Sequence, residues 1–215
     1  YSSIQASLYL QDPEYYITGD NCGNLSFWNL TAGNLSFQYQ LPLTGLNATN
    51  ASNLTFLCSL ANRSISNIIS VESKRRIAFS VDNSLYFFDI QSRNAFAISH
   101  QAKIGDITYL KKRDWVASGD VNGIVNIWST DGIFIKRCWV PYAIQTLESQ
   151  YDSNFLMVGG WSNYLNVINI ESGRIMKTFG INGYLTNIQD MQYTELMALG
   201  FSDNTLIIVN KHNWK

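Results

Sequence analysis

The chain has 215 residues, enough for one large domain or two small ones. Hydrophobic residues make up 46% of it and charged residues only 14%, against a usual charged share of about 25%. With a net charge of −1, no global field selects a partner, so any electrostatic argument must rest on local charge.

Cysteine use and hydropathy exclude further classes. Cys22, Cys58 and Cys138 are widely spaced and form no CxxC pair, so neither a disulfide framework nor a thiolate zinc site is expected. No apolar run approaches the ~18 residues that would indicate a membrane-spanning helix.

The clearest local signal lies in residues 114–129. Two predicted strands, Trp115–Ser118 and Ile124–Trp128, flank a polar turn with Asn122-Gly123, a strong hairpin signal. The arrangement recurs along the chain, so a period near 40 residues predicts a repeat architecture. With Trp128 as the marker, the matching positions are Trp28, Phe88, Trp128, Ile168 and Val209, at intervals of 60, 40, 40 and 41 residues.

Each repeat is predicted to hold four strands. In chain order, the first two repeats contain Ile4–Gln11, Tyr15–Gly19, Leu25–Leu30, Leu35–Leu41, then Ile65–Val71, Arg76–Ser80, Leu85–Ile90 and Ala95–Ser99. The third and fourth contain Ile107–Leu110, Trp115–Ser118, Ile124–Trp128, Ile133–Trp139, then Ile144–Gln150, Phe155–Gly159, Leu165–Ile170 and Arg174–Phe179. The fifth contains only Leu185–Gln192, Leu196–Gly200 and Leu206–Asn210.

Four antiparallel strands per ~40 residues, with Gly, Asn and Asp in the turns, are typical of a propeller blade. We therefore predict an all-β fold in which residues 1–215 form a single β-propeller segment of about five blades, the last incomplete. The blades cover approximately residues 4–41, 64–100, 104–140, 143–181 and 184–210, and a polar insertion at 42–63 is predicted to be a surface loop.

Residues 118–128, Ser-Gly-Asp-Val-Asn-Gly-Ile-Val-Asn-Ile-Trp, resemble the WD repeat, as do residues 18–28. His100 lies eighteen residues before Ser118, where the Gly-His pair of that family places its histidine. The resemblance implies a hydrogen-bonded network of His100, Ser118, Asn122 and Trp128 within one blade. Asn122 replaces the usual Asp of the family, which weakens the charge-assisted part of that network. Because the family usually closes a ring of six to eight blades, five units imply part of a ring.

Charge placement gives one candidate docking site. Two basic triplets, Lys74-Arg75-Arg76 and Lys111-Lys112-Arg113, fall at the same turn of adjacent repeats. Equivalent turns of adjacent blades emerge side by side, so the six residues are predicted to form one basic patch for an acidic partner. The alternative is a pair of solvated turns that keep blade edges soluble.

The opposite rim gives a second candidate. Its turns between second and third strands place five residues for contact with a peptide: Asp20, Asp120, Trp161, Tyr164 and Phe201. The resemblance implies that this rim often grips peptides, and exposed aromatic residues are enriched in interface hot spots. The alternative for Trp161 is packing over the neighbouring blade.

Seven N-x-Ser/Thr triplets all lie before residue 65. They begin at Asn24, Asn29, Asn34, Asn47, Asn50, Asn53 and Asn62. In a secretory compartment this region could carry glycans, whereas the triplets also arise by chance in an Asn- and Ser-rich chain.

Catalysis finds little support. His100 and His212 have no metal-site spacing, and no P-loop or GxGxxG sequence indicates a phosphate cradle. We expect no cofactor, no metal, no small-molecule substrate and no catalytic residues. The predicted function is a non-enzymatic scaffold that docks other proteins of a multi-subunit assembly on its rims.

Two alternatives remain open at this point: a glycosylated secreted or cell-surface ectodomain, and the non-catalytic propeller part of a larger enzyme. The scaffold interpretation predicts a cytoplasmic location, including cytoskeletal or ciliary assemblies, and the ectodomain interpretation predicts an extracellular one.

Overall fold

The computed structural model describes residues 3–11, 14–41, 64–150, 154–191 and 194–211. The chain divides into two compact units, Tyr1–Ser99 (unit 1) and His100–Lys215 (unit 2), and each is described by itself. The predicted insertion at residues 42–63 lies outside the described residues. None of the described helices is long or apolar enough to cross a membrane.

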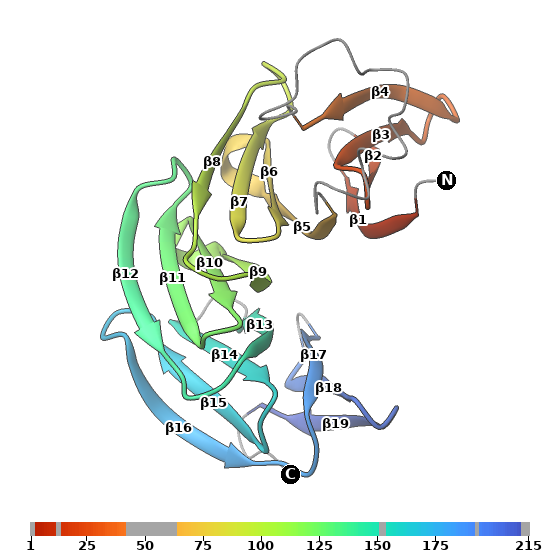
Figure 1. Ribbon diagram of the computed structural model, residues 1–215. Coiled ribbons are helices and arrows are strands. Elements are labelled where there is room, and N and C mark those ends of the chain that lie inside the picture. The colour runs from red at the N-terminus through yellow and green to blue at the C-terminus, as the bar shows by residue number, and fades with distance from the viewer. Residues whose placement is uncertain (1–2, 12–13, 42–63, 151–153, 192–193, 212–215) are drawn as a thin grey trace. The chain divides into compact units, whose positions relative to one another are not determined.

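Unit 1 contains two four-stranded antiparallel sheets, in the orders β1-β2-β3-β4 and β5-β6-β7-β8 (Figure 1). A three-residue 3-10 helix, η2 (Glu72–Lys74), links β5 to β6. The strands are β1 (Ile4–Leu10), β2 (Tyr15–Asp20), β3 (Asn24–Asn29), β4 (Asn34–Gln40), β5 (Ile65–Val71), β6 (Arg76–Val81), β7 (Ser84–Asp89) and β8 (Ala95–Ser99).

Unit 2 contains three antiparallel sheets, of which the last, β17-β18-β19, has three strands and the others four. A second 3-10 helix, η3 (Lys111–Arg113), links β9 to β10. The strands are β9 (Ile104–Leu110), β10 (Trp115–Asp120), β11 (Ile124–Ser129), β12 (Phe134–Trp139), β13 (Ile144–Ser149), β14 (Phe155–Gly160), β15 (Tyr164–Asn169), β16 (Arg174–Gly180), β17 (Leu185–Asp190), β18 (Leu196–Phe201) and β19 (Leu206–Asn210).

Every sheet is a meander in which consecutive strands pair, as short Gly- and Asn-containing turns require. Strand side chains alternate between the two faces of a sheet, and the middle strands are apolar on both. In unit 2, Val125 and Ile127 of one sheet pack in a common core with Leu156 and Ile168 of the next. The predicted all-β, WD-repeat-type propeller fold with an incomplete last blade is therefore confirmed.

The innermost strands of unit 2 are joined by hydrogen bonds from one sheet to the next. Asp106 Oδ2 on β9 accepts the backbone N–H of Leu147 on β13 at 2.7 Å. One sheet further, Thr146 Oγ1 accepts the N–H of Ile188 on β17 at 3.0 Å. A polar side chain at the same place in two repeats thus satisfies a backbone group of the next repeat.

Two glycines allow these strands to approach. A Cβ added to Gly119 would lie 2.8 Å from the side chain of Ile144, and one added to Gly159 would lie 2.8 Å from that of Leu185. At the matching Gly200 the nearest atom would be 3.7 Å away and belongs to its own sheet. Glycine is therefore required at 119 and 159 because a larger residue would collide with the neighbouring sheet.

Strand boundaries differ from the predicted ones mainly at first strands. β9 begins at Ile104, where Ile107 was predicted, because a β-bulge between Gly119 and Asp120 of its partner β10 lets the pairing continue. The same irregularity recurs near the start of β13, between Ile144 and Thr146. A bulge interrupts the alternation of apolar and polar residues, so the strand predicted from that alternation was too short.

Candidate interaction surfaces

A buried polar network ties the sheet β9–β12 together. His100 Nε2 lies 2.6 Å from Ser118 Oγ, and the same oxygen accepts the indole N–H of Trp128 at 2.8 Å. His100 Nδ1 lies 3.3 Å from Asp120 Oδ2, close enough for a hydrogen bond or an ion pair. Burial lowers the pKa of His100 more than Asp120 raises it, which favours a neutral ring that donates to the carboxylate and accepts from the serine.

The structure brings together three of the four residues expected for this network. The fourth, Asn122, is exposed in the turn, so its predicted role was wrong. Asp120 takes that role: besides meeting His100, its Oδ1 accepts the backbone N–H groups of Asn122 and Ile124, both at 3.0 Å. A carboxylate at the end of the strand, directly before the turn, can reach both the turn amides and the histidine, whereas an exposed turn residue cannot.

Ser118, His100 and Asp120 contact one another in the order of a catalytic serine, histidine and aspartate. Ser118 is fully buried, and its hydroxyl is already occupied by Trp128. None of the three lines the two cavities described below. The arrangement therefore holds the strands and the preceding loop in place.

The next sheet holds an equivalent network that the sequence did not indicate. Tyr142, in the loop before β13, donates its hydroxyl to the carbonyl of Val158 at 2.9 Å. Asn166 donates to the same hydroxyl at 2.9 Å and accepts from Thr178 Oγ1 at 2.7 Å. Burial raises the pKa of Tyr142 to about 12, so the hydroxyl stays protonated. Tyr142 also borders a cavity of about 250 Å³ with Pro141.

The two basic triplets lie at equivalent turns, one in each unit. Arg76 donates to Asp89 Oδ2 at 3.5 Å, and Arg113 pairs with Glu171 and donates to Asn154 at 3.3 Å. The remaining members are Lys74, half-buried, and Arg75, Lys111 and Lys112, exposed. Arg76 and Arg113 therefore contribute to the turns themselves, and the single six-residue patch stays a prediction.

The five residues predicted for contacts on the opposite rim divide into two groups. Asp20 and Asp120 are buried because their carboxylates cap their own turns; Asp20 Oδ1 accepts the N–H groups of Cys22 and Asn24, both at 2.9 Å. Phe201 is 5% exposed and belongs to the core of the last sheets. These three predictions of exposure were wrong, because a turn residue that caps or packs is withdrawn from solvent.

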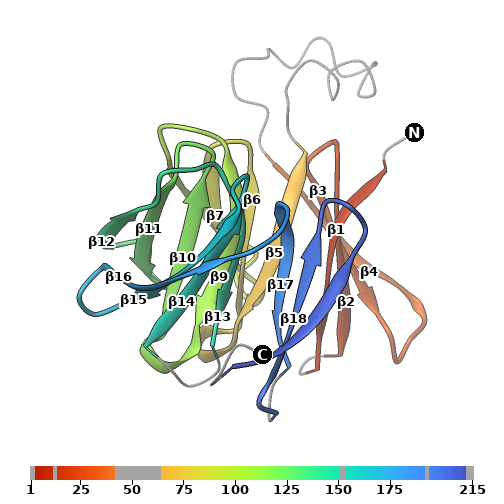
Figure 2. The ribbon, with the colours of Figure 1, turned by 90° about the horizontal axis from the view of Figure 1, so that it is seen from below.

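Trp161 and Tyr164 are exposed, at 68% and 54%. Two aromatic residues missed in the sequence lie at the same end of unit 2: Trp139, 60% exposed, pairs with Ile124 beside the β10–β11 turn, and Tyr184, 50% exposed, precedes β17. In an antiparallel meander the turn between the second and third strands and the connection from the fourth strand to the next sheet lie at the same end, so these residues share one end of unit 2. In Figure 2, β10, β17 and β18 run roughly upright. We call Trp139, Trp161, Tyr164 and Tyr184 the aromatic rim.

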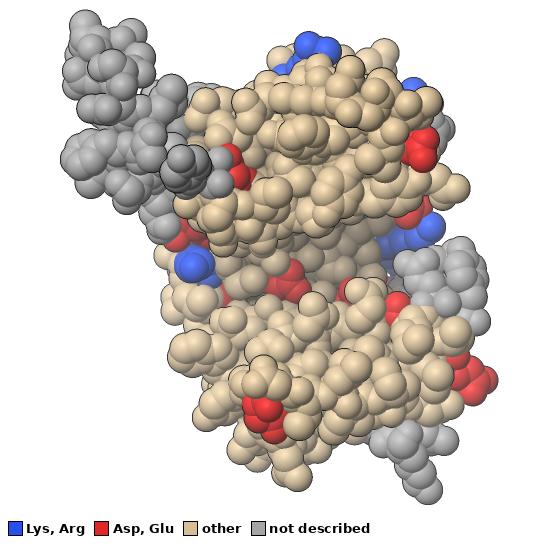
Figure 3. All heavy atoms as spheres, turned by 90° about the vertical axis from the view of Figure 1, so that its right-hand side faces the viewer, with Lys and Arg blue, Asp and Glu red and all other residues tan. Residues whose placement is uncertain are grey.

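The aromatic rim carries little charge. Among the described turns and connections at this end of unit 2, Lys103 and Asp203 are the exposed charged side chains. Figure 3 shows another face of the molecule, on which Asp, Glu, Lys and Arg occupy scattered positions among uncharged side chains. The opposite end of unit 2 differs, because its turns hold the charged rim: Lys111, Lys112, Arg113, Glu171, Arg174 and Glu195.

No group of three or more His, Cys, Asp or Glu side chains is placed to hold a metal ion within the described ranges. Cys22 and Cys138 are buried thiols, and burial raises the pKa of Cys138. Cys58 and His212 lie outside the described residues.

Three of the seven glycosylation triplets fall on described residues. The side-chain amide of Asn24 donates to Asp20 Oδ2 at 2.7 Å, and Asn29 Oδ1 accepts the N–H of Ala32 at 2.8 Å. Asn34, at the start of β4, is exposed. Asn47, Asn50, Asn53 and Asn62 lie outside the described residues.

No protein-family model matches the chain. Among curated proteins, "Regulator of rDNA transcription protein 13" from Saccharomyces cerevisiae is 23% identical over 176 residues, which cover 72% of this chain and 89% of that protein.

Among solved structures, a chain in the crystal structure of the mitotic checkpoint complex superposes with a TM-score of 0.78 at 12% identity. The match covers 97% of this chain and 61% of that one, so the chain spans less than two thirds of its length. This likeness supports the propeller fold of WD-repeat type.

Proposed function

We propose that this protein is a non-enzymatic interaction platform whose aromatic rim docks an uncharged segment of another protein. The observation that carries the proposal is four large aromatic side chains, each at least half exposed, at one end of unit 2. Tryptophan and tyrosine are the residues most enriched in interface hot spots, and charged residues are depleted at interface cores.

Rigidity supports this role. The rim residues lie beside strand ends that are held by the buried networks of His100 and Tyr142. The rim is therefore ordered before a partner binds, which lowers the conformational-entropy cost of binding. The solved relative comes from a named multi-protein complex, and the curated relative is named as a regulator of transcription. We therefore extend to this chain a role in protein assembly, with transcription assemblies among the partners to screen.

The test begins with a photo-reactive amino acid at Ser162, between Trp161 and the start of β15, to identify proteins that contact the rim. Each identified partner is then titrated against the double variant Trp161→Ala, Tyr164→Ala. We expect binding at least about tenfold weaker, because each hot-spot side chain contributes more than about 1 kcal/mol. Ile133→Ala is the matched control, since Ile133 is 67% exposed in a turn at the other end. Equal affinity for the double variant and the control would refute the proposal.

A second contact is proposed at the exposed lysines of the charged rim. Lys111 and Lys112 extend from η3 and suit an acidic segment of a partner. Lys111→Glu with Lys112→Glu is expected to weaken such a partner several-fold at low salt and to have little effect at high salt, because exposed charges are screened. A salt-independent loss would contradict this contact.

The ectodomain alternative has its own test. A mobility shift of the native protein on glycosidase treatment would favour it, and with it an extracellular location. An unchanged mobility agrees with the proposed cytoplasmic platform.

A further inference from the structure

Two asparagine-glycine steps occur in the chain, and the structure holds them differently. Each follows a β-branched residue, in Val121-Asn122-Gly123 and in Ile181-Asn182-Gly183, and both lie in unit 2. In such a step the backbone nitrogen of the glycine can attack the side-chain amide carbon of the asparagine, because glycine has no side chain to obstruct the approach. The local sequences alone therefore predict similar reactivity for the two steps.

The step at Asn122 is closed to this attack. The N–H of Gly123 donates to the carbonyl of Asp120 at 3.1 Å, and the Gly123 carbonyl accepts the N–H of Val140 at 2.9 Å. Gly123 is also buried, and a Cβ added to it would collide with the Val140 carbonyl. Attack by the Gly123 nitrogen would therefore break the bond to Asp120 and move a backbone that is tightly enclosed.

The step at Asn182 is open by comparison. Asn182 is exposed in the connection from β16 to β17. Within the described residues, neither its side-chain amide nor the N–H of Gly183 has a hydrogen-bond partner. A Cβ added to Gly183 would meet only Phe201, at 3.5 Å, so the reacting nitrogen has space around it.

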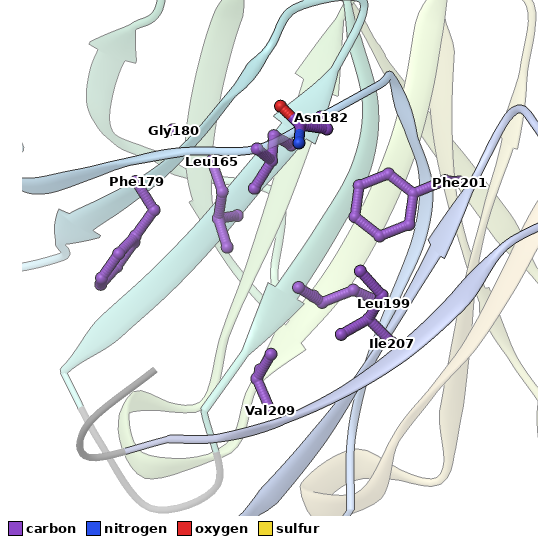
Figure 4. A pocket seen from close by; sticks show the side chains of 9 residues that line it. Leu165, Phe179, Gly180, Asn182, Leu199, Phe201, Ile207 and Val209 are labelled. Carbon is purple, nitrogen blue, oxygen red and sulfur yellow. The ribbon is translucent and has the colours of Figure 1, made fainter. Parts of the chain in front are cut away.

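The surroundings of Asn182 explain why no protein group holds its amide. Asn182 borders a cavity of about 260 Å³ whose other lining residues, among them Leu165, Phe179 and Leu199, carry no hydrogen-bonding side-chain group (Figure 4). An amide that no hydrogen bond restrains can turn its carbon toward the following backbone nitrogen, as ring closure requires.

The preceding connection, between β12 and β13, shows that this exposure belongs to the repeat. In both connections the residue before the compared pair donates its N–H to the hairpin turn of its own sheet at 2.9 Å, so Asn182 matches Pro141 and Gly183 matches Tyr142. Pro141 is exposed although both sheets beside it have four strands. Tyr142 fixes its connection through a buried hydroxyl, and Gly183 has no side chain to do so.

We propose that Asn182-Gly183 is a site of spontaneous deamidation beside the aromatic rim. The backbone nitrogen of Gly183 forms a bond to Cγ of Asn182, and the side-chain nitrogen leaves as ammonia with the proton of that N–H. A water molecule then opens the cyclic imide at either carbonyl, which gives aspartate or isoaspartate. The reaction consumes water and needs no oxidant or cofactor.

The product changes the aromatic rim in charge and in backbone length. A carboxylate replaces a neutral amide two residues before Tyr184, at the end of unit 2 where Lys103 and Asp203 are the exposed charged side chains of the described connections. Isoaspartate also inserts a carbon atom into the backbone between β16 and β17. The reaction does not depend on docking, so it can be confirmed or refuted whether or not the rim binds a partner.

The test follows both steps in the purified folded protein by peptide mapping with mass spectrometry, during incubation at mildly alkaline pH. Aspartate and isoaspartate are expected to form at Asn182 at least about tenfold faster than at Asn122, the ratio that the loss of one or two hydrogen bonds would give. In the urea-unfolded chain the two rates should become similar, because the local sequences match.

Asn182→Gln is the decisive variant, because a glutamine amide must close a larger ring and reacts more slowly. It should remove the acidic species that ion-exchange chromatography resolves as the protein ages, and it should leave conversion at Asn122 unchanged. Asn122→Gln is the matched control and should leave the acidic species in place.

Equal rates at the two steps in the folded protein, or faster conversion at Asn122, would overturn the proposal. An acidic species that persists in Asn182→Gln would overturn it as well. So would a difference in rate that survives unfolding, since the sequence and not the structure would then set the rates.

Discussion

The sheets β9–β12 and β13–β16 solve the same structural problem with different side chains. In the first, His100 reaches Ser118 Oγ at 2.6 Å; in the second, Tyr142 reaches the carbonyl of Val158 at 2.9 Å. Ser118 and Val158 occupy matching register positions, next to Gly119 and Gly159. The comparison teaches that the loop before each sheet must be anchored to the second strand, and that the anchoring residue type can change.

Removal of the histidine should have the largest effect. His100→Ala leaves a cavity and takes partners from buried Ser118 and Asp120, so we expect a loss of about 3 kcal/mol in the free energy of unfolding. Urea unfolding followed by tryptophan fluorescence measures it. A loss below about 1 kcal/mol would show that the anchor is dispensable in this sheet.

The tyrosine anchor should matter somewhat less. Tyr142→Phe keeps the ring and removes one hydroxyl, which leaves Asn166 and the Val158 carbonyl short of a partner, at a cost of about 1–2 kcal/mol. Tyr164→Phe, which removes the hydroxyl of a 54% exposed side chain, is the control. If both variants unfold alike, the two sheets are not anchored in the same way.

The pH dependence should separate the sheets further. Burial raises the pKa of Asp106 and Glu148 to about 7, above the values of 3.8 and 4.5 expected when unfolded. A raised carboxyl pKa contributes stability that is present at low pH and is lost as the pH rises through about 7. His100 has a lowered pKa and acts oppositely, since its contribution is lost as the pH falls below about 6.5.

Asp106→Asn should therefore flatten the stability profile between about pH 4 and 7, by roughly 1 kcal/mol after screening at a half-buried site. Chemical unfolding at each pH gives the profile. If the free energy of unfolding of this variant depends on pH as it does in the unmodified protein, the dependence comes from Glu148 of the sheet β13–β16.

The smallest effect is expected at Asn122. Its side chain is exposed, and its backbone N–H supplies the bond to Asp120, so Asn122→Ala should change the free energy of unfolding by less than about 0.5 kcal/mol. Asp120→Asn should cost more, because that carboxylate caps the turn and meets His100. A larger loss of unfolding free energy in Asn122→Ala than in Asp120→Asn would support the role first predicted for Asn122.

The sequence predicted most of the fold and part of the site. The repeat period and hairpin turns located all described strands, because they are local signals, and the family resemblance located His100, Ser118 and Trp128. Tyr142 was missed because it lies two residues before its strand, in a position where the family pattern has no counterpart. Its one signal was the polar Asn166 within an apolar strand.

Exposure at the rims was harder to predict. Trp161 and Phe201 both lie at second-to-third strand turns, yet one is 68% exposed and the other 5%. Phe201 belongs to a core cluster shared by its own sheet and the preceding one, whereas Trp161 lies in the turn that follows β14 and belongs to none of the described core clusters. Tertiary packing decided this difference, and no local pattern records it.

The bonds between inner strands carry a thermodynamic consequence. Because Asp106 accepts the backbone N–H of Leu147, and Thr146 that of Ile188, each of the first two sheets of unit 2 holds a backbone group of the sheet that follows it. If one sheet unfolded, a backbone N–H of the following sheet would lose its acceptor, and unfolding would spread from sheet to sheet. Unit 2 should melt cooperatively, as nearest-neighbour coupling in repeat proteins requires.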